Sequence, residues 1–148
     1  EVNLSLIENI VITNNVIPNL KDILKPAATD RVSEINPNEA IKFLNKWASS
    51  WENKSFQEYF KCYADSFYPK KFNSKDSWLT DRRSKIKNKK NIKVKISNIR
   101  IISFGENSFL AQFTQSYNSD SFSDVVDKHV TVSLEKNSFK ITGEYILK

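Results

Sequence analysis

Residues 92–104, IKVKISNIRIISF, set the architecture, because apolar and polar side chains alternate along them. Apolar residues recur at every second position from Ile92 to Ile96, which is the period of a β-strand with one buried face. The alternation slips by one residue at Ser97–Asn98 and resumes at Ile99. A one-residue slip inside a strand predicts a β-bulge, which bends the sheet.

Three further alternating segments follow toward the C-terminus, separated by turn residues. The expected faces of these strands are Phe109, Ala111, Phe113, Gln115 and Tyr117, then Val126, Lys128, Val130, Val132 and Leu134, then Phe139, Ile141, Gly143, Tyr145 and Leu147. The sequence therefore predicts an antiparallel meander of about four strands.

The period is helical before residue 92. Asn36–Glu39 is a helix start with a cap-like Asn and a Pro at the first position, and apolar residues then follow at helical spacing up to Trp51. A second capping box at Ser55 predicts a helix that Pro69 stops, and a third, shorter helix is expected from about Ser74. Helices followed by a meander predict an α+β fold, with three N-terminal helices packed on one face of a curved sheet.

Residues 1–37 differ from the rest, because their apolar positions follow no single period and three prolines interrupt them. We expect an N-terminal arm or interdomain linker there, and one domain over residues 38–148. The sequence contains no methionine, so we expect a fragment or a processed product. No apolar run approaches the ~20 residues of a membrane helix, so no transmembrane segment is expected in this chain.

Composition excludes several functional classes. Two glycines cannot build a phosphate-binding loop or a dinucleotide fingerprint. One histidine and one cysteine can form neither a multi-histidine metal site nor an internal disulfide. We therefore expect no metal and no cofactor.

The net charge of +6 is concentrated in residues 38–91, which carry 13 basic and 6 acidic side chains. The densest part, residues 82–90, is typical of a surface that attracts polyanions, or of a solvated helix end, and we favour the second interpretation. Nucleic-acid binding ranks last, because aromatic residues are not interleaved with the basic ones.

Several motifs together resemble one known family. They are Trp47–Trp51 (WASSW), Tyr59, Tyr63, Phe67, Trp78, Arg82–Arg83, Phe113–Tyr117 (FTQSY), Lys128 and Lys140–Glu144 (KITGE). The arrangement resembles the cone-shaped nuclear-transport-factor-2-like, or cystatin-like, fold. Within it, residues 38–148 look similar to the accessory domain of bacterial cell-shape-determining L,D-transpeptidases and L,D-carboxypeptidases.

This resemblance implies a non-catalytic domain in the periplasm or cell envelope that binds a peptidoglycan fragment or another envelope glycan. The arm at residues 1–37 would connect it to a catalytic domain outside this chain. The transpeptidase signature, a His followed by Ser-x-Gly-Cys, is not matched, because Cys62 precedes His129 and has no Gly beside it. A second possibility, from a different class, is a protein-interaction or dimerisation scaffold of an envelope assembly complex of the secretion type, in which the sheet could form a homodimer.

Lys128 is the most informative single residue, because it points where its apolar strand neighbours point. A lysine on a buried face must find a partner or reach water. It either contacts a carboxylate or sugar oxygen of a ligand in the cone, or pairs with a structural acid or extends to a sheet edge.

Arg82 shares a helix face with Trp78, four residues earlier. An Arg fork binds a carboxylate at two points, and an adjacent aromatic ring can stack on a sugar or peptide. The alternative is a helix-to-sheet salt bridge from Arg82, possibly to Glu144. A Lys–Glu pair inside the cone could also perform acid–base chemistry, but we prefer a structural ion pair.

Further ligand-contact candidates are Tyr59, Tyr63 and Tyr117, whose hydroxyls can orient a ligand. Gln115 is polar where its strand face is otherwise apolar, so it is the second candidate after Lys128. No residue is assigned a catalytic role. His129 is expected to be exposed on the face opposite Lys128.

Overall fold

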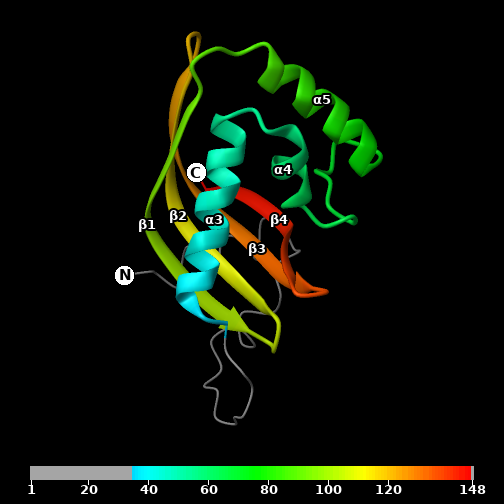
Figure 1. The fold of residues 1–148 in the computed structure, drawn as a ribbon, viewed down its shortest axis with the longest axis vertical. Helices are drawn as coiled ribbons and strands as arrows, with labels where there is room; N and C mark the ends of the chain where they lie inside the picture. The colour runs from blue at the N-terminus through cyan, green and yellow to red at the C-terminus, as the bar shows by residue number, and fades with distance from the viewer. Residues whose placement is uncertain (1–34, 148) are drawn as a thin grey trace.

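The computed structural model describes residues 35–147, which form three helices followed by a four-stranded antiparallel sheet. The helices are α3 (Pro37–Glu52), α4 (Phe56–Lys61) and α5 (Lys75–Lys87), and the strands are β1 (Lys93–Phe104), β2 (Ser108–Asn118), β3 (Ser123–Glu135) and β4 (Ser138–Leu147). All three helices lie on one side of the curved sheet (Figure 1), which confirms the predicted α+β fold. The arm expected at residues 1–37 lies outside the described residues, apart from its last three.

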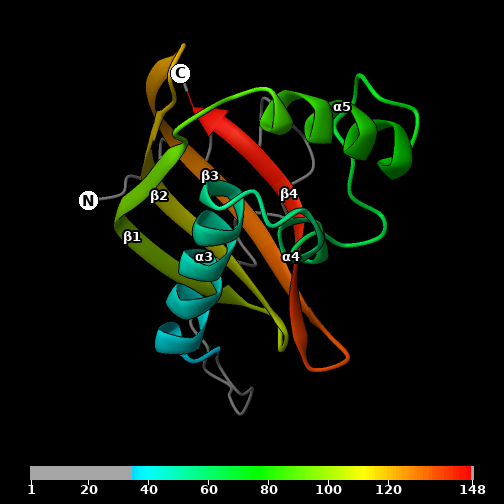
Figure 2. The ribbon, with the colours of Figure 1, turned by 45° about the horizontal axis from the view of Figure 1, so that its top comes forward.

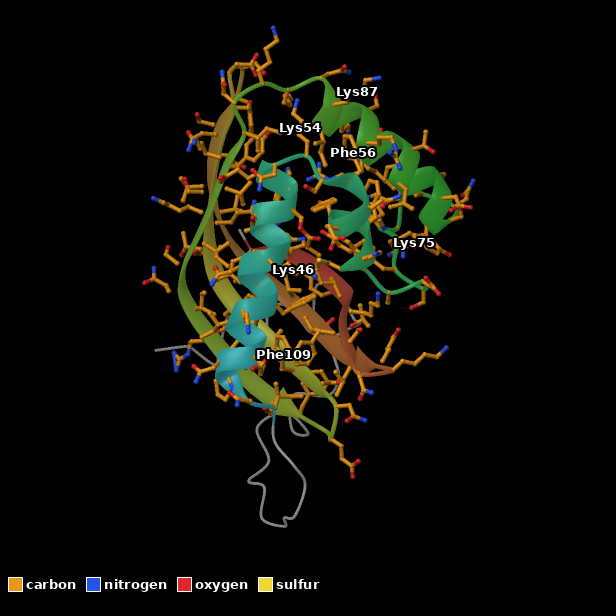
Figure 3. The ribbon with its side chains drawn as sticks, viewed as in Figure 1. Lys46, Lys54, Phe56, Lys75, Lys87 and Phe109 are labelled. Carbon is orange, nitrogen blue, oxygen red and sulfur yellow. The ribbon has the colours of Figure 1, made fainter. Side chains whose placement is uncertain are left out.

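Helix α3 is capped as the sequence predicts and covers the middle of the sheet. The side chain of Asn36 accepts a hydrogen bond from Asn38 N at 2.8 Å, and Pro37 occupies the first turn. Phe109 of β2 is fully buried and lies beside the first turns of α3 (Figure 3). The buried face of α3 consists of Ala40, Leu44, Trp47, Ala48, Ser50 and Trp51.

The predicted bulge in β1 is present. Pairing with β2 shifts register between Ser97 and Arg100, and Asn98 has a φ of 54°. Asparagine tolerates this left-handed conformation better than most residues. A bulge bends the strand that carries it, and the sheet curves around α3 (Figure 2).

A second bulge, which the alternation does not reveal, lies between β3 and β4. Val132 is opposite Ile141, whereas Val130 is opposite Glu144, so Thr142 lies in the irregular part of the register. Because β-strand side chains alternate, this irregularity reverses the facing of the residues that follow. Glu144 therefore lies on the helix-covered face of the sheet, together with Val130.

The predicted facing of the last strand is consequently wrong in part. Gly143, Tyr145 and Leu147 were expected to share a face with Ile141. Tyr145 and Leu147 instead lie on the opposite face, across from His129 and Asp127.

Helix α4 is shorter than predicted, because the chain leaves the helix at Cys62 and pairs with β4. Ile141 N donates to Cys62 O at 2.6 Å, and Ala64 N donates to Ile141 O at 2.8 Å. These two bonds replace the helical bonds of the predicted continuation to Pro69. Ser55 precedes α4 but makes no side-chain cap, so the capping box expected there is also wrong.

Helix α5 begins after Ser74, as predicted, and lysines hold it at both ends. Near its start, Lys75 Nζ donates to Tyr63 O at 2.9 Å. Near its end, Lys54 Nζ donates to Lys87 O at 3.3 Å, and Figure 3 shows Lys54 close to that end. The contacts fix the position of a helix that carries Arg82.

The second bulge is tightly packed, which gives a first prediction. A Cβ on Gly143 would lie 2.3 Å from Tyr145 Oη and 2.8 Å from Thr131 Oγ1. We expect Gly143→Ala to lower the free energy of unfolding by about 1–3 kcal/mol in urea denaturation, because the added methyl group overpacks the site. In a Tyr145→Phe background the same change should cost less, since the nearest atom is gone. A Gly143→Ala protein as stable as wild type would contradict this account.

Candidate functional site

A cavity of about 600 Å³ lies between the helices and the helix-covered face of the sheet. Exposed side chains line it as well as buried ones, so it opens to solvent. Among the described elements, α3, α4 and α5 contribute to it, together with β2, β3 and β4. The aromatic, polar and charged side chains that line it include Trp51 of α3, Tyr59 of α4, Trp78 and Arg82 of α5, Gln115 and Tyr117 of β2, Lys128 of β3 and Glu144 of β4.

An ion pair between Lys128 and Glu144 forms part of the cavity wall. Lys128 Nζ lies 2.6 Å from Glu144 Oε2, and the lysine side chain is only 5% exposed. The OH of Tyr63 donates to Glu144 Oε1 at 2.7 Å. Burial alone would raise the pKa of Glu144, but the charge and hydrogen bond of Lys128, with the bond from Tyr63, hold it below its usual value. Glu144 is therefore an ionised carboxylate with both oxygens engaged.

Lys128 is thus paired with a structural acid and also lines the cavity. Its Nζ lies 5.4 Å from the centroid of the Trp47 ring and 5.6 Å from that of Trp51. The faces of indole rings attract cations electrostatically. The two rings therefore help Glu144 to stabilise the buried positive charge of Lys128.

A chain of hydroxyls connects this pair to Arg82. Arg82 Nε donates to Tyr59 OH at 3.2 Å, and Tyr59 OH lies 3.3 Å from Tyr63 OH. Because Tyr63 gives its one proton to Glu144, Tyr59 must donate to Tyr63. Trp47 Nε1 also donates to Tyr63 OH, at 2.9 Å. Burial raises the pKa of both tyrosines, so both hydroxyls stay protonated.

Arg82 is not in direct contact with Glu144, which corrects one of the alternatives drawn from the sequence. Within residues 35–147 its hydrogen bond is to Tyr59, and the two tyrosine hydroxyls separate it from the carboxylate. Its guanidinium carbon lies 4.9 Å from the Trp51 ring centroid. The Nη groups make no hydrogen bond to the described part of the chain. Within residues 35–147, Arg82 therefore presents Nη donors that no side chain or carbonyl engages, at a cavity wall.

Gln115 is a buried amide with unused hydrogen-bonding capacity. It is 6% exposed, it lines the cavity, and its Oε1 has no hydrogen-bond partner among the described residues. Leaving such an acceptor unpaired costs about 1–3 kcal/mol. Tyr117, two residues on, lies with its ring 5.3 Å from that of Trp51.

The structure gathers the candidate residues predicted from sequence around one cavity. Seven of the eight line it, and Tyr63 lies behind the wall, bonded to Glu144. Sequence reasoning missed the exposed residues Phe122 and Ile146 at the same cavity. An isolated aromatic in the polar segment 118–124, NSDSFSD, was the available signal for Phe122.

Comparison with known families bears directly on this arrangement. The family model described as the Cds6 C-terminal NTF2-like domain matches residues 39–145. The chain belongs to this family. The resemblance drawn from the aromatic and basic motifs is thereby confirmed.

Solved structures share the fold of this NTF2-like domain. Bd1075 from Bdellovibrio bacteriovorus matches with a TM-score of 0.68 and 24% identity, over 74% of this chain and 39% of that one. A variant of the helical cell shape determining protein Pgp2 from Campylobacter jejuni matches with a TM-score of 0.67 and 19% identity, over 72% of this chain and 39% of that one. An NTF2-like protein of unknown function from Pseudomonas putida matches with a TM-score of 0.63 and 10% identity, over 74% of this chain and 84% of that one. A comparison with curated protein sequences finds no match.

The described part of the NTF2-like domain contains neither a metal-binding cluster nor a membrane-spanning helix. Across residues 35–147, no three His, Cys, Asp or Glu side chains are grouped so as to hold a metal ion. The same residues include no helix of the length and apolarity needed to cross a membrane. Cys62 is buried, and burial raises the pKa of its thiol to about 11, so it is a protonated packing residue.

His129 is buried, contrary to the prediction. It lies on the face opposite Lys128, as expected, but is only 1% exposed. Its Nε2 lies 3.1 Å from Gln112 Nε2, and its Nδ1 has no partner in the described residues. Burial lowers the pKa of His129 to about 4, although the charge of Asp127 opposes the shift. The alternation of residues along a strand predicts which face of the sheet a side chain lies on, but it does not predict how far that side chain is exposed to solvent.

The buried ion pair gives a second prediction. We expect Lys128→Met to lower the free energy of unfolding by about 3 kcal/mol, because the Glu144 carboxylate loses its cation inside the wall. The double variant Lys128→Met/Glu144→Gln should recover most of this loss. Chemical denaturation of the four proteins in a double-mutant cycle measures it. Additive losses in the double variant would show that the two side chains are not coupled.

His129 gives a third prediction, in pH dependence. Its pKa is lower in the folded than in the unfolded protein, so its contribution to stability is present above pH 6.5 and lost as the pH falls toward about 4. The lowered pKa of Glu144 acts at lower pH, below its ordinary value of 4.5. We therefore expect the denaturant concentration at the unfolding midpoint to decrease in wild type as the pH is lowered from 6.5 to 4.5. The decrease should be less steep in His129→Gln. Equal slopes in the two proteins would refute the assignment.

Proposed function

We propose that this NTF2-like domain is a non-catalytic ligand-binding accessory module that recognises a fragment of peptidoglycan or another glycan of the bacterial envelope. The observation that carries the proposal is the buried Oε1 of Gln115 in the cavity wall, which has no hydrogen-bond partner within residues 35–147. A folded protein rarely buries an acceptor without a partner. A ligand hydroxyl or amide N–H in the cavity would supply the missing donor.

The charges of the wall indicate the kind of ligand. Arg82 offers donors in the fork geometry that suits a carboxylate, and its position is fixed by Tyr59 and the Trp51 ring. Peptidoglycan stem peptides carry carboxylates and amides, and their sugars carry hydroxyls. The site therefore combines a carboxylate-binding group with an unpaired acceptor, which matches such a ligand.

The relatives support the envelope context. Pgp2 is described as a cell shape determining protein, and the regions matched in Bd1075 and Pgp2 are 39% of those chains. We infer that the domain accompanies a separate catalytic part in the periplasm or cell envelope. Both the catalytic neighbour and the location are part of the proposal.

The geometry of the ion pair favours binding over catalysis. A general base needs a free carboxylate oxygen within reach of a substrate proton. Glu144 has one oxygen on Lys128 and the other on Tyr63, and its pKa lies below the ordinary value. The pair is suited to holding the wall in shape.

The second candidate is an interaction scaffold that dimerises through the face of the sheet opposite the three described helices. The observation in its favour is a cluster of partly buried apolar side chains on that face, formed by Ile102, Phe104, Tyr145 and Leu147. Failure to bind envelope fragments, together with a dimer in solution that substitutions in this cluster disrupt, would favour the scaffold.

The ligand-binding proposal is tested with Gln115→Leu, whose expected effects on stability and binding have opposite signs. Removal of the unpaired acceptor should raise the free energy of unfolding by about 1 kcal/mol. It should also weaken binding of a disaccharide tetrapeptide from peptidoglycan about tenfold, measured by NMR titration.

The matched control is Gln112→Leu, a glutamine on the same strand but on the opposite face, near His129. It should destabilise the fold and leave the affinity unchanged. Absence of chemical-shift changes in the wild type at millimolar fragment would refute the proposed function.

A further inference from the structure

An exposed aromatic ring lies at the cavity, on the connection between β2 and β3. Phe122 is 53% exposed and nevertheless lines the cavity that contains Arg82, Gln115 and Lys128. Its ring centroid lies 6.1 Å from that of Tyr117, at an interplanar angle of 46°. Ile146, 54% exposed, lines the same cavity, so two exposed apolar side chains belong to its lining rather than one scattered residue.

The connection that carries Phe122 is held in place by its own hydrogen bonds. Lys90 N donates to Asp120 Oδ1 at 2.8 Å, and Asp120 N donates to Lys90 O at 2.9 Å. Ser119 N donates to Phe122 O at 2.8 Å, which closes the turn. Lys89 Nζ adds a bond to Ser121 Oγ at 3.2 Å. The backbone that carries the ring is therefore held in place before any ligand arrives.

The surroundings of the ring indicate what it contacts. Asp124 and Lys89 line the same cavity as Phe122, and Lys89 is bonded to the preceding residue, Ser121, so the cavity lining near this turn also carries groups that form hydrogen bonds. An acyl chain would leave such groups unpaired, whereas a pyranose ring presents an apolar C–H face and a rim of hydroxyls. An aromatic body next to polar side chains is complementary to both parts of a sugar.

We propose that Phe122 is a sugar-stacking platform at the cavity mouth and a specificity-determining residue for glycan-bearing fragments. A pyranose ring packs on Phe122, while the acidic peptide part of the same fragment extends to Arg82 and Gln115. This inference rests on the proposed function and adds to it that the recognised unit includes both sugar and peptide. A ligand in this orientation joins the exposed mouth of the cavity to its buried wall.

The test compares two probes, the disaccharide tetrapeptide of peptidoglycan and the same tetrapeptide without sugars, by NMR titration of the full chain. We expect Phe122→Ala and Phe122→Leu to weaken binding of the disaccharide tetrapeptide by about 3- to 10-fold, since each removes the flat aromatic face. Phe122→Trp should retain binding. The affinity for the sugar-free tetrapeptide should be lower than that for the disaccharide form in wild type and unchanged by any of these substitutions.

The matched control is Val125→Ala, because Val125 is 67% exposed, belongs to the neighbouring strand and is not part of the cavity. It should bind both probes as wild type does. Retained binding in Phe122→Leu, or an equal loss for both probes in Phe122→Ala, would overturn the sugar platform while the proposed function stands. A wild type that binds neither probe would overturn the proposed function, and this inference with it.

Discussion

A lysine on the inner face of an aromatic cone imposes the constraint on which the rest of the site depends. The charge of Lys128 must be compensated where water is largely excluded, and Glu144 compensates it at 2.6 Å. Glu144 reaches that face only because the register of β4 is irregular at Thr142. Its second oxygen then holds Tyr63, and through Tyr59 the network reaches Arg82 on α5. One buried charge thus links strand register, tyrosine orientation and helix position.

Prediction from sequence succeeded where a local pattern carries the information. The bulge in β1 is visible because an apolar position is skipped at Ser97–Asn98, and α5 starts at its own capping serine. The second bulge left no such trace, because Thr142 and Gly143 interrupt no apolar run. The end of α4 was also hidden, since it is decided by pairing with Ile141, about eighty residues later in the chain.

The candidate residues were found for a related reason. Lys128 and Gln115 are polar at positions where the strand period demands apolar side chains, so the sequence marks them directly. Their partners are not marked in this way, because hydrogen-bond partners depend on the fold. The pattern offered Glu144 as a direct partner of Arg82, and the structure inserts two tyrosine hydroxyls between them. A half-exposed ring such as Phe122 has no periodic signature at all.

The bulge in β1 has one more consequence, for self-association. β1 is an edge strand of the sheet formed by residues 35–147, and an edge strand could template an added strand from another molecule. The left-handed kink at Asn98 interrupts that template, and Lys93, Lys95 and Arg100 place positive charge along it. At the opposite edge, the bridge between Tyr63 and Ile141 occupies part of β4. The fold therefore carries built-in protection against aggregation through its sheet edges, independent of whatever its cavity binds.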